Sequence, residues 1–344
     1  MKLAVRAPNW LGDAVMALPA LQALRDSRPF ARLTVVARSS VADIFRLSGL
    51  CDDVLAIPSP HGSGGWAATL QAARSLREYH FDAGLILPNS FESALVFRAA
   101  GIRDCWGYAR DARGLLLRSA VAPPAKGEGP RHEVFYYLEL LRRLGLIPSL
   151  PESAVPTLRL SLESLARGAA ILRDAGLSGN VIAISPGAAN SRAKQWPPDR
   201  FVEAARLAAT DLDASIAVFG TPQERELAEA ITAKLVSHGA DAHSLAGATS
   251  LADFICAIAN CRLLITNDSG GMHVAYAAGV PTAAIFGPTI PEETGPLGIH
   301  SLVLREPVEC SPCMLKDCPI DHRCMLRLTP ERVAREAVAL VQFP

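Results

Sequence analysis

The sequence contains no apolar run long enough to cross a membrane. A spanning helix needs roughly 20 consecutive apolar residues, and the richest runs of this 344-residue chain, such as 181–185 and 281–286, have only the length of a strand. The apolar pattern at the start of the chain is broken by Arg6, Pro8 and Asn9 before the core of a signal peptide could form. We therefore expect a soluble, cytoplasmic protein with no transmembrane segment and with many buried strands.

The chain also lacks an excess of charge of either sign. Lysine plus arginine and aspartate plus glutamate number 34 each, so the bulk charge indicates neither nucleic acid nor a membrane surface as a partner. Residues 1–165 hold 19 basic and 15 acidic side chains, and residues 166–344 hold 15 and 19. A difference of this size is common without any function, and the alternative is that the first half meets an anionic partner.

Two glycine motifs of nucleotide-binding proteins are absent. The strand expected at 3–6 runs into a turn with one glycine, Gly12, where a nicotinamide site would carry a spaced triplet. A glycine and lysine pair of the Walker type does not occur either. Asp13 stands in this turn instead. It is either a carboxylate favoured by the helix dipole or a general base at the carboxyl end of a strand.

Short β-rich runs alternate with amphipathic helical patterns, which is typical of parallel α/β layers. The expected strands are 3–6, 33–37, 53–57, 84–87, 181–185, 215–219, 263–266 and 282–286. The expected helices are 12–26, 41–47, 66–79, 90–100, 132–144, 162–175, 199–209, 223–237, 251–259, 271–278 and 330–341. A proline-rich connector near 147–156 separates two similar series. We therefore predict two Rossmann-like, doubly wound parallel-sheet domains, 1–155 and 156–329, that face a cleft.

Two turns of the second domain carry residues suited to a nucleotide. The turn after the strand at 181–185 contains Ser185, Gly187 and Lys194, whose small residues let N–H groups approach a phosphate while the lysine supplies a positive charge. The turn after the next strand carries Glu224, where a carboxylate can accept both hydroxyls of a ribose. An ordinary solvated loop and an ordinary first-turn helix carboxylate are the alternatives.

A third turn gives the strongest local signal. Asp268 and Ser269 precede Gly270 and Gly271, which open a helix whose free N–H groups have the geometry that binds a phosphate. Asp268 and Ser269 are either helix caps or ligand contacts, and an aspartate there suits a sugar hydroxyl better than a diphosphate. His273, one turn into the helix, is either a packed polar residue or a donor to a phosphate or sugar oxygen.

The eight cysteines are unevenly placed. Four of them lie in apolar settings and are expected to be ordinary buried thiols: Cys51, Cys105, Cys256 and Cys261. The other four lie within fifteen residues and have a spacing that permits a structural four-thiolate metal site: Cys310, Cys313, Cys318 and Cys324. Because a Cys-x2-Cys pair occurs only once among them and the second pair is loosely spaced, we leave the structural metal site open. We expect no metal in catalysis.

Taken together, these features resemble the ADP-heptose:lipopolysaccharide heptosyltransferases, glycosyltransferases of the GT-B fold. The resemblance runs along nearly the whole chain. It rests on Trp10-Leu11-Gly12-Asp13, Ser185-Pro186-Gly187-Ala188, Lys194-Gln195-Trp196-Pro197, Asn267-Asp268-Ser269-Gly270-Gly271-Met272-His273, Phe286-Gly287-Pro288-Thr289, Glu309-Cys310-Ser311-Pro312-Cys313 and Leu328-Thr329-Pro330-Glu331-Arg332. Within the family, the Lys-x-Trp-Pro form and the cysteine-rich tail look more like heptosyltransferase II than heptosyltransferase I.

The resemblance implies roles for the acceptor side and for the diphosphate. Asp13 would be the base that removes a proton from the acceptor hydroxyl. Lys194 and the N–H groups near Ser269, Gly270 and Gly271 would hold the diphosphate.

The resemblance also implies how the rest of the donor is held. Glu224 would bind the adenosine ribose, although Glu226 is close enough to leave the register open. Asp268 and His273 would complete the donor pocket beside the loop of Ser185 and Gly187.

The implied reaction is inverting transfer of L-glycero-D-manno-heptose from ADP-heptose to the heptose of the lipopolysaccharide inner core, without a cofactor. Domain 1–155 would bind the acceptor, with the C-terminal helix 330–344 packing back on it, and domain 156–329 would bind the donor. Since the acceptor is a membrane glycolipid, the enzyme would lie at the inner face of the inner membrane.

Three alternatives remain open. The first is heptosyltransferase I, which acts on the Kdo of the core. The second is a sugar-nucleotide epimerase on the same fold, and the third is a non-catalytic module that binds a nucleotide sugar.

Overall fold

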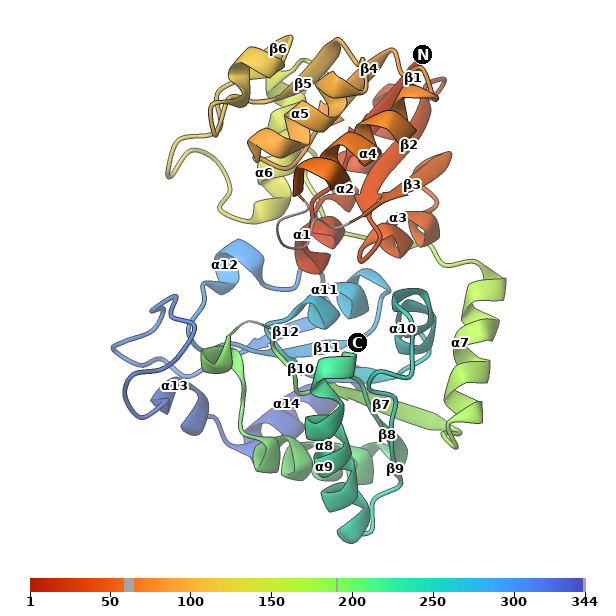
Figure 1. Ribbon diagram of the computed structural model, residues 1–344. Coiled ribbons are helices and arrows are strands. Elements are labelled where there is room, and N and C mark those ends of the chain that lie inside the picture. The colour runs from red at the N-terminus through yellow and green to blue at the C-terminus, as the bar shows by residue number, and fades with distance from the viewer. Residues whose placement is uncertain (59–64, 190, 343–344) are drawn as a thin grey trace. The chain divides into compact units, whose positions relative to one another are not determined.

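The computed structural model describes residues 1–58, 65–189 and 191–342, and it divides into two compact units at Arg159 and Leu160 (Figure 1). The division lies four residues beyond the boundary predicted from the proline-rich connector. None of the helices in this described part of the chain combines the length and apolarity needed to span a bilayer.

The first unit is built on six parallel strands in the order β3-β2-β1-β4-β5-β6. The strands are β1 Lys2–Arg6, β2 Arg32–Arg38, β3 Asp53–Ile57, β4 Ala83–Ile86, β5 Asp104–Tyr108 and β6 Ser119–Val121. The helices are α1 Leu11–Met16, α2 Leu18–Ser27, α3 Ala42–Ser48, α4 Gly65–Arg77, α5 Phe91–Ala99 and α6 Glu133–Arg143. Helices α4 and α5 pack with one face of the sheet, and α2 packs with α6. The unit is therefore doubly wound, as predicted.

One predicted helix of this unit is interrupted. The pattern at 12–26 predicts a single helix, whereas the structure has α1 and α2, divided at Ala17. Pro19 lies in the first turn of α2, where its missing N–H costs nothing because first-turn N–H groups have no partner within the helix. In a continuous helix the same proline would remove a hydrogen bond, so the chain restarts the helix there.

The second unit repeats the plan with six parallel strands in the order β12-β11-β10-β7-β8-β9. The strands are β7 Asn180–Ser185, β8 Ala214–Val218, β9 Ala242–Ser244, β10 Leu263–Asn267, β11 Thr282–Ile285 and β12 Ser301–Leu304. The helices are α7 Leu162–Asp174, α8 Pro198–Leu212, α9 Arg225–Ser237, α10 Leu251–Ile258, α11 Gly270–Ala277, α12 Pro291–Thr294, α13 Arg323–Leu326 and α14 Pro330–Gln342. Helices α8, α9 and α14 share one apolar core with the sheet, and α7 packs against α10.

The C-terminal helix α14 corrects one prediction. We expected it to pack back on the first domain, but its apolar face lies in the core of the second unit. Val333, Ala334 and Ala337 are almost fully buried there, beside α8 and strands β10 to β12. The helix covers a face of the second sheet that would otherwise expose apolar strand residues, which is why it stays with this unit.

Candidate active site

The loops predicted to bind the donor in the second unit meet where strands β7 and β10 lie side by side. Ser185 ends β7 and pairs in register with Thr266 of β10. In the order β12-β11-β10-β7-β8-β9, the strands from β7 onward are added on one side and the strands from β10 onward on the other. The boundary between β7 and β10 is therefore the topological switch point of the sheet. Open α/β sheets bind their ligands at the carboxyl ends of the strands at such a point. The loops that contain Gly187 and Asp268 therefore stand at the place where a ligand is expected.

Asn267 joins these two loops. Its Oδ1 accepts a hydrogen bond from the backbone N of Trp196 at 3.0 Å, and its Nδ2 donates to the carbonyl of Pro186 at 2.7 Å. The side chain is fully buried, so both bonds are shielded from water. Sequence reasoning quoted Asn267 within a motif but gave it no role. Its position beside Asp268 was the signal that could have found it.

Lys194 and Asp268 form the central charged pair of the site. The Nζ of Lys194 lies 2.7 Å from Oδ2 of Asp268, and Oγ1 of Thr289 donates to the same oxygen at 2.7 Å. Asp268 is 5 % exposed, whereas the Lys194 side chain is 28 % exposed. The ammonium group of Lys194 is therefore partly accessible to solvent, while the Asp268 carboxylate is buried and held by a hydrogen bond. Thr289, which sequence reasoning quoted without a role, is the residue that fixes it.

The first turn of α11 has no side-chain cap. Ser269 occupies the N-cap position, but its side chain makes no capping hydrogen bond, so the helix-cap explanation of Ser269 does not hold. An ideal Cβ on Gly271 would lie 3.5 Å from Oγ of Ser185 and 3.7 Å from Oγ of Ser269. Two hydroxyls thus converge on the N-terminus of an eight-residue helix, where N–H groups and the helix dipole favour an anion.

His273 is packed into α11. The residue is 4 % exposed, and its Nδ1 lies 3.3 Å from the hydroxyl of Tyr276. The structure therefore holds the ring within the helix layer, and a contact from His273 to the donor stays a prediction.

Glu224 lies against the donor loop. An ideal Cβ on Gly187 would fall 1.9 Å from Oε1 and 2.2 Å from Cδ of Glu224, so only glycine leaves room for this carboxylate. Its Oε2 accepts from the backbone N of Thr221 at 2.8 Å, as in a capping box. Glu226, the alternative, is exposed in the first turn of α9. The geometry favours Glu224 over Glu226 as the carboxylate of the donor loop.

Replacing Gly187 by alanine is expected to displace the Glu224 carboxylate. The new methyl group meets the end of a flexible side chain and not backbone, so the melting temperature should change little. A hydrogen bond to a charged group contributes about 1.5–3 kcal/mol, so the KM for a nucleotide-sugar donor should rise about 10- to 100-fold. Steady-state kinetics with Gly187→Ala measures this.

Two further variants serve as controls for Gly187→Ala. Glu224→Ala should raise the donor KM by a similar factor, whereas Glu226→Ala should leave it unchanged. An unaltered donor KM in both Gly187→Ala and Glu224→Ala would remove Glu224 from donor binding.

The segment that carries the clustered cysteines supports the Lys194 loop. The backbone N of Ala193 donates to the carbonyl of Lys316 at 2.9 Å, and Nε2 of His322 lies 2.8 Å from the carbonyl of Ala193. An ion pair between Arg192 and Asp317 adds a third link at 2.6 Å. The residue that precedes Lys194 is thus held from both sides by a segment far along the chain.

The cysteines themselves are free thiols. In that segment Cys310 and Cys313 are exposed and Cys324 is buried, and burial raises the pKa of the Cys324 thiol. Within 1–58, 65–189 and 191–342, no three His, Cys, Asp or Glu side chains are grouped as metal ligands. Cys310, Cys313 and Cys318 each add electrostatically to the raised pKa of Cys324, so the four thiols lie near one another although they are not grouped as ligands. The structural metal site that their spacing permits stays a prediction. Among the other four thiols, Cys105, Cys256 and Cys261 are buried, as predicted, whereas the prediction is wrong for Cys51, which is only partly buried.

Asp13 lies in the first unit, in the first turn of α1 after β1. The carboxylate is partly buried, and this burial raises its pKa above the ordinary value of an aspartate. Its charge also contributes to the raised pKa of Tyr137, a buried residue of α6, after the larger effect of burial. A carboxylate of raised basicity at the carboxyl end of a central strand has the properties of a general base.

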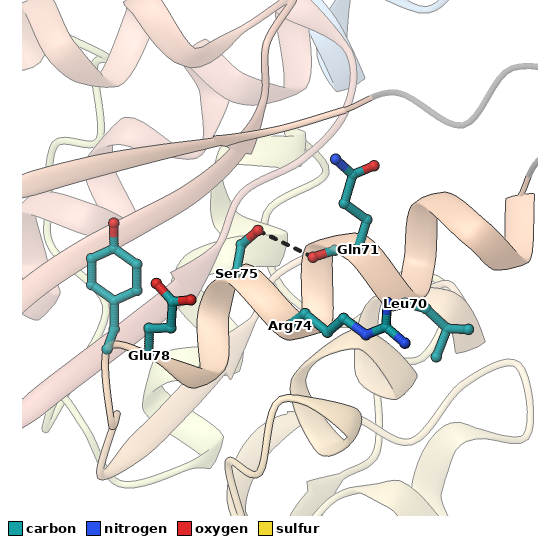
Figure 2. A pocket seen from close by; sticks show the side chains of 6 residues that line it. Leu70, Gln71, Arg74, Ser75 and Glu78 are labelled. Atoms are coloured by element: carbon teal, nitrogen blue, oxygen red, sulfur yellow. Dashed lines mark hydrogen bonds between the residues drawn. The ribbon is translucent and has the colours of Figure 1, made fainter.

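A pocket of about 410 Å³ lies on the outer face of α4 and is not the candidate site (Figure 2). Its lining includes Leu70, Arg74 and Tyr79, and Oγ of Ser75 donates to the carbonyl of Gln71 within the helix. The carbonyl of Tyr79 accepts from Nζ of Lys2, at the amino end of β1. This end of the sheet is opposite to the one at which open α/β sheets bind ligands.

Comparison with known proteins identifies the family of this chain. Residues 69–323 match the family model described as glycosyltransferase family 9 (heptosyltransferase). Lipopolysaccharide heptosyltransferase 2 of Escherichia coli is 30% identical over 346 residues, which cover 99% of each chain.

Solved structures give the same assignment. The structure of the E. coli ADP-heptose lipopolysaccharide heptosyltransferase II superposes with a TM-score of 0.83 at 30% identity, covering 99% of both chains. A family 9 glycosyltransferase from Veillonella parvula gives a TM-score of 0.85 at 20% identity, covering 100% of this chain and 97% of that one. The α/β architecture of two Rossmann-like domains is thereby confirmed as the GT-B type. The chain belongs to glycosyltransferase family 9, the heptosyltransferase family, and is a glycosyltransferase.

Proposed function

We propose that this protein is a lipopolysaccharide heptosyltransferase II, which moves L-glycero-D-manno-heptose from ADP-heptose to the heptose of the inner core. The observation that carries the proposal is the donor site of the second unit. There Lys194 and the uncapped first turn of α11 offer positive charge to a diphosphate at the β7/β10 switch point. Relatives named heptosyltransferase 2 over nearly the full length of the chain support this substrate.

Each donor group meets a residue of matching chemistry. The diphosphate binds Lys194 and the N–H groups of Gly270 and Gly271. Because Lys194 already touches Asp268, the diphosphate shares the lysine with a carboxylate that Thr289 holds in place. Asp268 is thus directed toward a sugar hydroxyl and not toward the phosphates. Oε1 of Glu224 accepts the ribose hydroxyls.

The reaction is a single displacement with inversion. Asp13 takes the proton of the acceptor hydroxyl while that oxygen attacks the anomeric carbon from the face opposite to ADP, so one carboxylate base suffices. Negative charge develops on the leaving diphosphate, and Lys194 with the α11 N-terminus stabilises it without a metal or cofactor. The first unit binds the acceptor. Because that acceptor is a membrane glycolipid, the enzyme acts at the inner face of the inner membrane.

ADP release from ADP-heptose tests the proposal. We expect ADP only when a heptose-terminated lipid A core acceptor is present. ADP formed only with an acceptor that ends in Kdo would assign the protein to heptosyltransferase I instead. ADP formed without any acceptor would indicate an epimerase-like or hydrolytic activity, and no ADP under any condition would exclude this donor.

A further inference from the structure

Two arginines stand together at the carboxyl ends of β1 and β2 in the first unit. Arg6 is paired in register with Val36, and Arg38 follows Val36 by two residues on the same strand. Because side chains alternate between the two faces of a strand, Arg6, Val36 and Arg38 project from the same face. That face is covered by α4 and α5, and its apolar layer includes Ala4 and Val36. The two guanidinium groups therefore end this layer at the edge where ligands bind.

Among the described residues, the hydrogen-bond partners of the Arg6 guanidinium are all neutral. Its Nη1 donates to the carbonyls of Ala7 at 2.7 Å and Val36 at 3.3 Å, and its Nη2 donates to Oδ1 of Asn9 at 2.7 Å. The residue is 3 % exposed, and its Nε is buried without a hydrogen-bond partner in the described part of the chain. A buried cation without a paired anion is costly.

Arg38 adds a second unsatisfied cation beside it. Its Nε is also buried without a partner among the described residues, while the side chain as a whole reaches solvent. Burial, and then the charge of Arg38, lower the pKa of Arg6 to about 10, whereas the charge of Glu92 raises it. No ion pair joins either arginine to Glu92 or to another carboxylate within 1–58, 65–189 and 191–342. The two like charges repel each other, and the charge of Glu92 compensates only in part, so an anion bound here would be favoured.

We propose that Arg6 and Arg38 form a subsite for an anionic group, a phosphate or a carboxylate, of the acceptor. The inference rests on the proposed function, because it assigns the anion to the acceptor glycolipid. The partly exposed side chain of Arg38 would contact the anion directly. The buried guanidinium of Arg6 would stabilise the negative charge of the anion without contacting solvent. Asn9, which accepts a hydrogen bond from Arg6, lies in the β1–α1 connection, four residues before Asp13 in the first turn of α1. Binding of the anion therefore fixes the loop that leads to the base.

The test compares Arg38→Gln with Arg32→Gln in the full-length enzyme. Arg32 lies at the amino end of the same strand, exposed and paired with Asp53, so it serves as the matched control. We expect Arg38→Gln to raise the KM for the heptose-terminated lipid A core acceptor about 10- to 100-fold, the range for a charged hydrogen bond. The KM for ADP-heptose should not change in either variant, and Arg32→Gln should match the wild type.

Modified acceptors distinguish the two anions. One acceptor has its phosphates removed and the other has its carboxylates reduced. Whichever modification removes the true ligand should raise the wild-type KM, and Arg38→Gln should then raise it no further. Arg6→Lys, which keeps the charge but loses the three hydrogen bonds, should show a smaller effect in the same direction.

The outcomes separate the inference from the proposed function. Wild-type ADP release that depends on the acceptor, with an unchanged acceptor KM in Arg38→Gln, overturns the anion subsite alone. An Arg38→Gln effect that persists in full on both modified acceptors also overturns it. A wild type that releases no ADP with this acceptor overturns the proposed function, and the subsite with it. A rise in wild-type acceptor KM with salt that is weaker in Arg38→Gln supports the subsite.

Discussion

Asp13→Asn is expected to lower kcat by about 10²–10⁴ while leaving the fold intact, because loss of a positioned general base typically costs that much. The side chain makes no helix-capping contact that the amide would disturb, and α1 begins after Trp10 without a side-chain cap. Turnover measured at saturating donor and acceptor tests this. Near-normal turnover in the variant would remove Asp13 from the role of base.

The pH dependence provides a second readout for Asp13. Burial raises the pKa of this carboxyl, and only its deprotonated form can accept a proton. The activity of the wild type should therefore rise as pH increases through this raised pKa. This rise should be absent from the pH–activity profile of Asp13→Asn. Asp43→Asn is the matched control, since Asp43 is also a first-turn aspartate of a helix in this unit. Its turnover and pH profile should equal those of the wild type.

Lys194→Ala is expected to lower kcat about 10²–10³-fold, comparable to the loss of one donor that stabilises developing negative charge. The lysine is the cation that the donor site presents next to the first turn of α11, and its side chain is partly open to solvent. Single-turnover rates with saturating donor separate this effect from weaker donor binding. Lys234→Ala, which removes an exposed lysine paired with Asp199 in the same unit, should have normal rates.

A double variant identifies the cause of the loss. Removing Lys194 leaves the buried carboxylate of Asp268 with the hydroxyl of Thr289 as its side-chain partner among the described residues, and an unpaired buried charge can distort a site. Lys194→Ala combined with Asp268→Asn removes that charge. If the rate stays low, the missing positive charge at the diphosphate is responsible. Recovery of the rate in the double variant would show instead that the stranded carboxylate caused the defect.

Much of the fold could be predicted because its central elements are long and strongly patterned. Strands β1, β2, β7 and β10 are apolar runs with turn residues behind them, and their neighbours carry helical periodicity. The strands that the pattern missed lie toward the edges of the two sheets, where segments are short or contain polar residues: β5, β6, β9 and β12. A three-residue segment such as Ser119–Val121 has no measurable period. It becomes a strand only because β5 offers it backbone partners.

The sequence also predicted which loops hold donor residues, but not how they contact each other. Parallel strands end at a common edge, so polar residues placed after apolar runs gather there wherever the strands lie. The pairing of Lys194 with Asp268 requires β7 and β10 to be neighbours, and this follows from sheet order and not from local pattern. The cross-link by Asn267 and the choice of Glu224 over Glu226 depend on the same order and on the missing side chain of Gly187.

By itself the sequence determined the class of fold and the family, and it predicted the domain boundary and the residues of the site. These depend on short-range periodicity and on motifs, which a single segment contains. Only the tertiary structure decided the ion pair at Asp268, the position of α14 in the second core and the adjacency of Arg6 and Arg38. Each of these joins segments distant along the chain, and the energy of such a contact exists only after the strands between them have been ordered.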